Sequence, residues 1–587
     1  MDDFIFGTLS TDSLRIQRVQ NRLRGVTHTS HIPRDPMPGE EITLQLSIGP
    51  DQPADQAWVY WTTDQTDPEG KMGEAEHGFA TEMKETGSKW ELGIWGFTRT
   101  FEATLPAQKS GTVLRYRLSG TSICQGEDFA DQGTYYALYI DLDEPPEWSK
   151  EAVLYQIFSD RFSPGKNKTW LQTNNLDALF GGTLKGVTDN LDYLESLGIT
   201  VIWFTPIFPS ETYHRYDTTD VYNIDPHMGT KEDFKKLLDQ AHKRGIRILL
   251  DLVPNHWSQK HSTFLDAQQN PNSKYRDWYT FKHWPNDYEC FFGSRHMPKI
   301  NLRNPEARKY IIDSAVHWLK IGVDGFRVDY AIGPTPDFWA DLRKATRQAK
   351  KDSWIFGESV DDADTLLSFD GVMDGSLDFP LLEGFRNAFG FAKWNACQLA
   401  RYVDDMERFY PDDFQRISFF DNHDMNRFSW IAKNDWNRLR LVALCQFTLK
   451  YPPILYYGTE VGMTQRRDAL QGGRKLDSEA RLPMLWGDAQ NKPLLDYFQN
   501  LISFRKENPL IWQGERKTLY SDADFWVYEI NSKRKRLVVC LNLNANEKAL
   551  PYSLNVKKIL FTSHGGEIRR EGDEWVVPGL SGFVVRV

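Results

Sequence analysis

Hydrophobic positions in the middle of the chain follow two alternating periods. Short apolar runs such as 201–208 and 246–253 fit buried strands. The stretch between them, 230–245, instead carries apolar residues three and four positions apart, which is the period of one helix face. Strands that alternate with helices in this way predict parallel βαβ units.

Eight such units follow one another between about residue 150 and residue 460. Helices are predicted at 184–197, at 230–245 with a capping box starting at Thr230, and after Asn304, where Pro305 fits the first helical position. Eight βα units predict a TIM barrel. Its strands are expected at 152–158, 201–208, 246–253, 325–330, 354–359, 371–379, 417–423 and 453–458.

The N-terminal and C-terminal parts of the chain have a different pattern of hydrophobic residues. Short β-like runs separated by Pro, Gly and Asp clusters, with no clear long helix, predict an N-terminal β-sandwich. β-like runs return near the C-terminus, and a Trp- and Tyr-rich insertion after the third strand is long enough to form a lobe. We therefore expect a β-sandwich over 1–145, the barrel over 146–513 with its inserted lobe at 254–302, and a second β-sandwich over 514–587.

Composition and charge narrow the class of protein. With 40% hydrophobic and 26% charged residues the chain is typical of a soluble globular protein, and no apolar run approaches the ~18 residues of a membrane span. The net charge of −11 argues against a nucleic-acid partner. Five cysteines without metal-ligand spacing, and an acidic Met1–Ile5 that lacks the basic and apolar regions of a secretory signal, favour a cytoplasmic protein.

Polar residues recur where the predicted barrel strands end. In a TIM barrel the catalytic groups come from the C-terminal ends of the strands. One Arg-x-Asp pair or one histidine is more often structural, but structural groups have no reason to concentrate on one face. The recurrence therefore favours a catalytic face made of Asp251 and His256 after strand three, Arg327 and Asp329 on strand four, Glu358 on strand five, and His423 and Asp424 on strand seven.

The order of charges on strand four predicts their roles. Arg327 and Asp329 point to the same side while Val328 packs outward, so we expect the guanidinium to lower the pKa of Asp329 and keep it ionised as a nucleophile. Glu358 lies one strand over, and a second carboxylate in a shared site tends to stay protonated, as a general acid must. A retaining glycosidase uses such a pair about 5 Å apart. Asp424 would add negative charge near the transition state.

At these residues the sequence resembles the α-amylase family of glycoside hydrolases. Four motifs carry the resemblance: Asp251–His256, Gly325–Asp329, Phe356–Glu358 and Phe420–Asp424. The resemblance implies Asp329 as nucleophile, Glu358 as acid/base and Asp424 as transition-state stabiliser. We expect the substrate, an oligosaccharide or α-glucan, to contact Tyr216 in the similar segment His214–Asp217, together with Asp251, His256, Phe291, Arg327 and His423.

Within the family, the N-terminal region and the segments Tyr288–Phe291 and Met297–Asn301 look like the neopullulanase, cyclomaltodextrinase and maltogenic amylase group. That likeness implies cleavage of α-1,4 bonds in maltooligosaccharides, cyclodextrins or pullulan, a carbohydrate-binding-like N-terminal domain, and a homodimer formed through it. The stretches Tyr330–Gly333 and Ser359–Val360 depart from the group on the leaving-group side of the site. Two alternatives stay open: a transglycosylase that uses the same intermediate, and a non-catalytic glycan-binding relative.

We expect no cofactor and no metal. Asn255 matches a position that binds calcium in many relatives, which makes Ca²⁺ an alternative. The segment Ser163–Lys168, however, lacks the acidic cluster that an oxygen-ligand site after the first strand would need.

Overall fold

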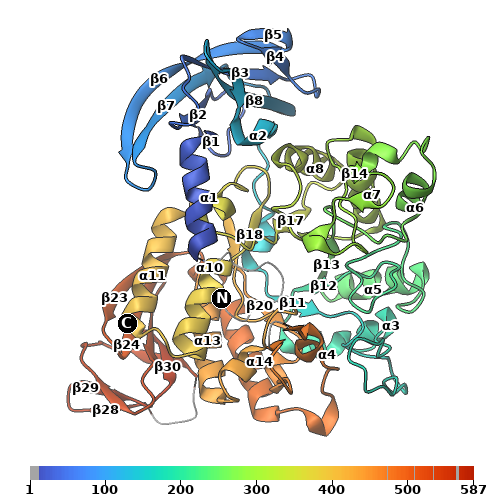
Figure 1. Ribbon diagram of the computed structural model, residues 1–587. Coiled ribbons are helices and arrows are strands. Elements are labelled where there is room, and N and C mark those ends of the chain that lie inside the picture. Colours follow the sequence, from blue (N-terminus) through green and yellow to red (C-terminus); the bar gives the residue numbers. More distant parts are fainter. Residues whose placement is uncertain (1–11, 472–473, 508, 533–534, 564–567) are drawn as a thin grey trace.

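The computed structural model describes residues 12–587 apart from 472–473, 508, 533–534 and 564–567. The acidic segment Met1–Ile5, on which the expectation about secretion partly rests, lies outside the described residues. Figure 1 shows an N-terminal region of strands, a central barrel surrounded by helices, and a C-terminal region of strands. Within the described ranges no helix is long and apolar enough to cross a membrane.

Eight parallel strands form the predicted barrel in the order β19-β18-β17-β16-β13-β12-β11-β20. A parallel bridge between Ser418 and Pro453 brings its two outermost strands together. All eight predicted strands are present and shorter than the apolar runs that predicted them. They are β11 (Leu154–Ile157), β12 (Val201–Phe204), β13 (Arg247–Leu252), β16 (Gly325–Val328), β17 (Trp354–Gly357), β18 (Gly375–Leu377), β19 (Gln415–Ile417) and β20 (Ile454–Tyr456).

One strand prediction was wrong in its position. The seventh strand was expected at 417–423 but ends at Ile417. Beyond the single bridge of Ser418 to Pro453 the chain leaves the ladder, and further on Asn422 Oδ1 accepts a hydrogen bond from the Asp424 backbone N–H at 2.8 Å in a local turn. His423 and Asp424 therefore lie in the loop after the strand.

The predicted helix signals mostly hold. Thr230 and Asp233 form a capping box, and Asn304 caps the helix that begins with Pro305. The segment 184–197 is two helices, because the Asn190 side-chain amide donates to the Gly186 carbonyl and interrupts the helix. The main barrel helices are α3 (Leu184–Thr188), α4 (Leu191–Leu197), α5 (Lys231–Lys243), α7 (Pro305–Ile321), α8 (Pro336–Ala349), α9 (Ala363–Leu367), α10 (Phe379–Phe385), α11 (Ala396–Phe409), α13 (Trp436–Thr448) and α14 (Lys492–Lys506).

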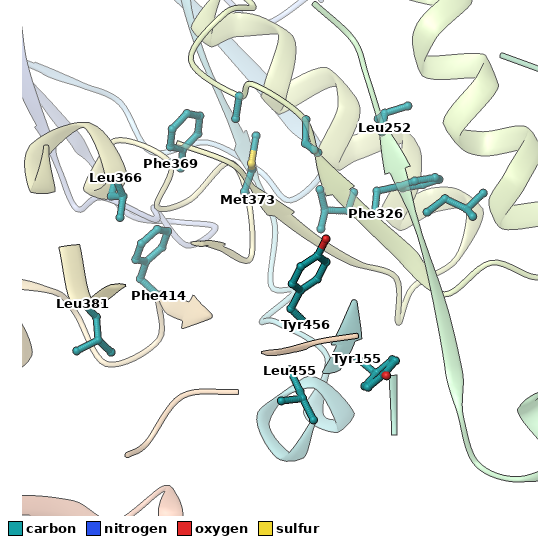
Figure 2. Packing of buried hydrophobic residues seen from close by; sticks show 14 of the residues in the cluster. Tyr155, Leu252, Phe326, Leu366, Phe369, Met373, Leu381, Phe414, Leu455 and Tyr456 are labelled. Atoms are coloured by element: carbon teal, nitrogen blue, oxygen red, sulfur yellow. The ribbon is translucent and has the colours of Figure 1, made fainter. Parts of the chain in front are cut away.

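Side-chain alternation along the strands produces two layers of core. Leu154, Trp203 and Phe356 belong to a cluster inside the barrel, whereas Tyr155 and Phe326 belong to the layer between strands and helices. Figure 2 shows part of that outer layer. Because Phe326 faces outward, its neighbour Arg327 faces the barrel interior.

The N-terminal region contains an antiparallel sheet in the order β1-β2-β7-β6-β3-β8-β10, with β9 paired to β8. A helix precedes it, α1 (Asp12–Arg24), where no clear long helix was expected. Its apolar residues Leu14, Ile16 and Val19 are exposed, so the helix lacks the buried apolar stripe on which helix prediction depends. The strands are β1 (Val26–Ile32), β2 (Ile42–Ile48), β3 (Gln56–Thr62), β6 (Phe79–Glu91), β7 (Gly96–Leu105), β8 (Thr112–Ser122), β9 (Gly126–Phe129) and β10 (Tyr136–Ile140).

This sheet is joined to the barrel through α8. Arg115 on β8 is buried and forms ion pairs with Asp337 and Asp341, and Val113 packs against Ala340 in a small apolar cluster. Asp337 and Asp341 also pair with Arg308 of α7, so one network of charges joins the sheet to α7 and α8.

The inserted segment after β13 contains α6 (Ser262–Gln269) and the hairpin β14 (Phe281–His283) and β15 (Asp287–Tyr288). At the other end of the chain, Arg516 pairs with Asp404 and Glu407 of α11 and holds the C-terminal strands against the barrel. Those strands form two sheets: β23 (Glu515–Ser521), β24 (Phe525–Ser532), β25 (Lys535–Asn542), β30 (Ser581–Arg586) and β27 (Lys558–Thr562) in one, and β26 (Lys548–Leu550), β29 (Glu574–Val577) and β28 (Arg569–Glu571) in the other.

Candidate active site

Three neighbouring strands bring the central charges of the site together. Arg327 on β16 lies level with Asp251 on β13 and with Phe356 on β17. Asp329 and Glu358 each follow their strand by one residue, where the Asp329 N–H donates to Leu252 and the Glu358 N–H to Val328. The sheet register thus places both carboxylates at the same C-terminal edge of the barrel.

Arg327 binds three carboxylates at once. Its Nη1 donates to Asp251 Oδ1 at 2.7 Å and to Asp329 Oδ1 at 2.9 Å, and its Nη2 lies 2.5 Å from Glu358 Oε1. The Tyr330 backbone N–H donates to the second oxygen of Glu358 at 3.2 Å. One fully buried guanidinium therefore holds Asp329 and Glu358 side by side.

The expectation that Arg327 lowers the pKa of Asp329 was wrong in its net direction. Burial is the largest cause and raises the pKa of Asp329 to about 7, although Arg327 opposes the rise. Burial likewise raises the pKa of Glu358, and Asp329 adds to that rise while Arg327 opposes it. Because one cation serves three carboxylates, the cluster keeps protons near neutral pH.

A chain of hydrogen bonds runs beneath these carboxylates. Gln156 Nε2 lies 2.7 Å from His423 Nδ1, and His423 Nε2 lies 2.6 Å from the Tyr216 hydroxyl. That hydroxyl donates to Asp251 Oδ2 at 2.9 Å. Burial lowers the pKa of His423 well below its usual value, so the ring is neutral. With Gln156 donating to Nδ1, the ring proton sits on Nε2 and points toward Tyr216.

Asp424 has a cation of its own. Arg481 lies in a 3-10 helix (Asp477–Arg481) after the eighth strand and donates from Nη2 to Asp424 Oδ1 at 2.9 Å. Its Nε donates to the His423 carbonyl at 2.8 Å, and its Nη1 to the Tyr213 hydroxyl at 2.9 Å. Burial still raises the pKa of Asp424 to about 7. Arg481 therefore fixes the position of Asp424 without removing its affinity for a proton.

A cavity of about 670 Å³ opens above the cluster. Of the residues expected at the site, Asp329, Glu358, Asp424, Tyr216, His256 and Phe291 line it. Asp251, Arg327 and His423 are not among its lining residues and lie beneath it, buried and bonded to the side chains above. The structure thus separates six residues that can touch a ligand from three that position them.

His256 is poised to meet a ligand. Its ring stacks on Phe291 with centroids 4.1 Å apart, and burial lowers its pKa to about 3. Its Nε2 is buried without a hydrogen-bond partner in the described structure. A buried polar atom of this kind costs stability unless something binds it, which fits a ligand hydroxyl.

Aromatic rings from the inserted segment form one wall of the cavity. Phe291 and Phe292 contact each other and both contact Tyr330, with centroids 4.6 to 5.3 Å apart. Tyr330 has a φ of 43°, an unfavourable conformation for a residue with a large side chain. The turn after Asp329 thus holds Tyr330 in a strained backbone conformation that places its ring at the cavity.

The surroundings of Asn255 bear on the alternative of a calcium ion. Asn255 Oδ1 is buried without a partner, but Ca²⁺ takes six to eight oxygen ligands. In the segment after the first strand, Ser163 Oγ already accepts from Gly165 and Asn190. Across the described residues, no group of three or more His, Cys, Asp or Glu side chains could hold a metal ion.

Sequence reasoning missed Arg481 and the cavity-lining residues of α1. In sequence, Asp477 and Arg481 look like an ordinary i,i+4 ion pair, which they also form. The position of Arg481 shortly after the eighth strand was the one available signal. Arg15, Arg18 and Arg22 of α1 gave none, because only the tertiary structure brings that helix to the cavity.

Comparisons with known proteins agree with this geometry. Residues 156–558 match the family described as "Alpha amylase, catalytic domain". The protein named alpha-amylase 2 of Dictyoglomus thermophilum is 36% identical over 552 residues, which is 93% of each chain. The cyclomaltodextrinase of Thermoanaerobacter pseudethanolicus is 33% identical over 440 residues, covering 71% of this chain and 75% of the relative.

A solved structure is also similar. The ligand-free cyclic alpha-maltosyl-(1→6)-maltose hydrolase of Arthrobacter globiformis superposes with a TM-score of 0.68 at 27% identity, over 76% of this chain and 99% of that one. The likeness covers about three quarters of this chain and nearly all of the relative.

Proposed function

Because this chain belongs to the α-amylase family of retaining glycoside hydrolases, we propose that it cleaves α-1,4-glucosidic bonds of short or cyclic maltooligosaccharides and of pullulan. The observation that carries the proposal is the single guanidinium of Arg327, which binds Asp329 and Glu358 together at the floor of the cavity. Two adjacent carboxylates are the requirement of a retaining mechanism.

In the first step Asp329 attacks the anomeric carbon as the bond to the leaving oxygen breaks, and Glu358 gives its proton to that oxygen. The raised pKa of Glu358 supports this role, because the acid must hold a proton at working pH. The Arg327 guanidinium favours the ionised form that Asp329 needs in order to attack.

In the second step Glu358 removes a proton from water, and the resulting hydroxide displaces Asp329 from the anomeric carbon. Asp424, held by Arg481, faces the positive charge that develops on the sugar in both steps. Tyr216 and His256 line the same cavity and would contact the reacting sugar through ring stacking and a hydrogen bond. Asp251, Arg327 and His423 are positioning residues.

Product analysis tests the proposal. We expect chromatography after incubation with maltotriose, pullulan and β-cyclodextrin to show shorter or linear products. Products longer than the substrate would instead indicate a transglycosylase, in which a sugar intercepts the intermediate before water does. No product from any of the three would favour a non-catalytic relative and contradict the proposal.

We also propose a homodimer formed through the N-terminal region. Trp90 in β6, Trp95 in the following turn and Phe97 in β7 are exposed, and the Trp90 ring contacts the other two rings. An exposed aromatic cluster of this kind is typical of an interaction surface. Sedimentation velocity over a range of concentrations tests the dimer, and Trp95→Ser is the variant expected to weaken it.

We also propose that the protein is cytoplasmic and that it needs no metal ion. All five cysteines are free, two of them exposed, which supports a reducing, cytoplasmic location that cell fractionation can test. We propose that activity survives chelation by EDTA.

The division into domains at about residues 145 and 513 can be tested by limited proteolysis, with cleavage expected near those two positions.

A further inference from the structure

The helix that precedes the N-terminal sheet reaches the catalytic cavity. Arg15, Arg18, Val19 and Arg22 of α1 line the same cavity as the catalytic carboxylates. Their spacing of three, four and seven residues places them on one face of the helix. Figure 1 shows α1 in dark blue, extending from the N-terminal strands toward the barrel. One stripe of the helix, mostly arginine, is therefore a wall of the site.

Contacts at the C-terminal half of α1 hold it in place. Gln20 Nε2 donates to the Gly93 carbonyl at 2.8 Å, and Arg24 donates to the Ile94 carbonyl at 3.2 Å. Arg24 also pairs with Asp51 at 3.2 Å. These partners belong to the N-terminal sheet region, so that region sets the position of the helix over the cavity.

Apolar burial does not explain why α1 lies there. Leu14, Ile16 and Val19 are 50%, 58% and 55% exposed. A surface helix is ordinarily held by a buried apolar stripe, and here three of the four α1 residues that line the cavity are arginines. The arrangement fits a surface that meets a polar ligand.

The helix stands on the side of the cavity where the leaving group must lie. Arg18 Nη1 is 3.6 Å from Asp361 Oδ2, in the loop that directly follows Glu358. Burial raises the pKa of Asp361, and both Arg18 and Arg22 oppose that rise, so both guanidinium groups are close to the loop. Glu358 protonates the leaving oxygen, so sugars beyond that oxygen extend toward this loop and toward α1.

The chemistry of this wall suits a neutral sugar. A guanidinium presents five donors in a planar fork, which can bridge neighbouring hydroxyls. Asp361, Asp362 and Glu383 line the same cavity, supply acceptors, and offset the positive charge that would otherwise favour an anion. A cavity of about 670 Å³ lies within the range of small-molecule sites.

We propose that the arginine stripe of α1, made of Arg15, Arg18 and Arg22, binds the leaving-group sugars of an oligosaccharide, and that the same place receives a sugar acceptor. This inference rests on the proposed function. The N-terminal helix thereby selects short or cyclic substrates whose leaving group fits between α1 and the Glu358 loop.

The test compares two substrates that differ in their leaving group. Maltotriose releases a sugar, whereas 4-nitrophenyl α-maltoside releases an aryl group that offers no hydroxyls to α1. For the double variant Arg18→Ala/Arg22→Ala we expect the ratio of kcat/KM for maltotriose to kcat/KM for the aryl maltoside to fall about tenfold, as the loss of hydrogen bonds from charged groups implies. The variant Arg18→Lys/Arg22→Ala, which keeps a positive charge at residue 18, is expected to show a smaller fall in this ratio than the double alanine variant.

A matched control lies on the same helix. Gln17 is exposed and does not line the cavity, so Gln17→Ala is expected to keep the wild-type ratio. Thermal melts of all variants show whether each is folded. With methyl α-glucoside as acceptor, the ratio of transfer to hydrolysis is also expected to fall in the double variant.

Failure of the inference about α1 can be distinguished from failure of the proposed hydrolase function. An active wild type whose substrate ratio stays within twofold in the double variant overturns the inference alone. An equal fall in Gln17→Ala does the same. A wild type that cleaves neither substrate overturns the proposed function and the inference with it.

Discussion

Arg481 Nη2 donates to Asp424 Oδ1 over 2.9 Å, although 57 residues separate them. The contact joins the loop after the seventh barrel strand to the short helix after the eighth. Since Arg481 also holds the His423 carbonyl, it fixes both the backbone and the side chain of this loop. Asp424 therefore owes its place in the cavity to a residue that no sequence motif marked.

Substituting Arg481 by Gln is expected to move the acidic limb of the kcat/KM profile to higher pH. Removal of the cation raises the pKa of Asp424 further above its present value of about 7, so less of the enzyme carries the ionised form. Arg481→Lys keeps the charge and is expected to keep most of the profile. An unchanged acidic limb in Arg481→Gln would show that Asp424 does not titrate in the reaction.

Asp329→Asn is expected to lower kcat by at least about 10³-fold, because the amide cannot form the covalent intermediate. The substitution is isosteric, so circular dichroism and the melting temperature should report a folded protein. A 2-deoxy-2-fluoro glycosyl fluoride is expected to add mass to the wild type at Asp329 and to leave the variant unmodified. Normal turnover by a folded Asp329→Asn protein would falsify the nucleophile assignment.

Arg327→Met is expected to destabilise the fold by about 3–5 kcal/mol at pH 8, because three buried carboxylates lose their common cation. Urea unfolding at pH 8 and pH 5 measures the effect, which should shrink at pH 5 as the carboxylates take up protons. Arg244→Met removes a surface pair with Asp192 and is expected to cost at most about 1 kcal/mol. Equal losses in both variants would count against a shared buried cation.

Stability is expected to fall as pH rises from about 4 to about 7, in part because of Asp424. Its pKa is about 7 in the fold against an ordinary value of 3.8, so between these two pH values the folded state binds a proton that the unfolded state has released. Asp424→Asn should flatten this dependence and raise the melting temperature at pH 8. The exposed Asp573 offers a control, because Asp573→Asn should leave the dependence as in the wild type.

Much of the fold could be predicted because local patterns and barrel architecture agree. The period of apolar residues indicated eight strands and located seven of them, and Thr230 and Asn304 marked helix starts that the structure contains. Strand ends were less certain, and the seventh strand stops at Ile417, six residues before its predicted end. Phe419 and Phe420 are buried beyond that end, so the apolar run continues past it and does not mark where strand pairing stops.

The sequence by itself determined which residues meet at the strand ends, because barrel register aligns Asp251, Arg327 and the positions after Val328 and Gly357. Tertiary structure decided how their charges behave: one buried Arg327 is divided among three carboxylates, and burial outweighs its attraction in the pKa of Asp329. It also decided what surrounds them, since Arg481 and the arginine stripe of α1 come from distant segments. Periodicity reports only local burial, whereas desolvation and contacts between distant segments exist only once the chain has folded.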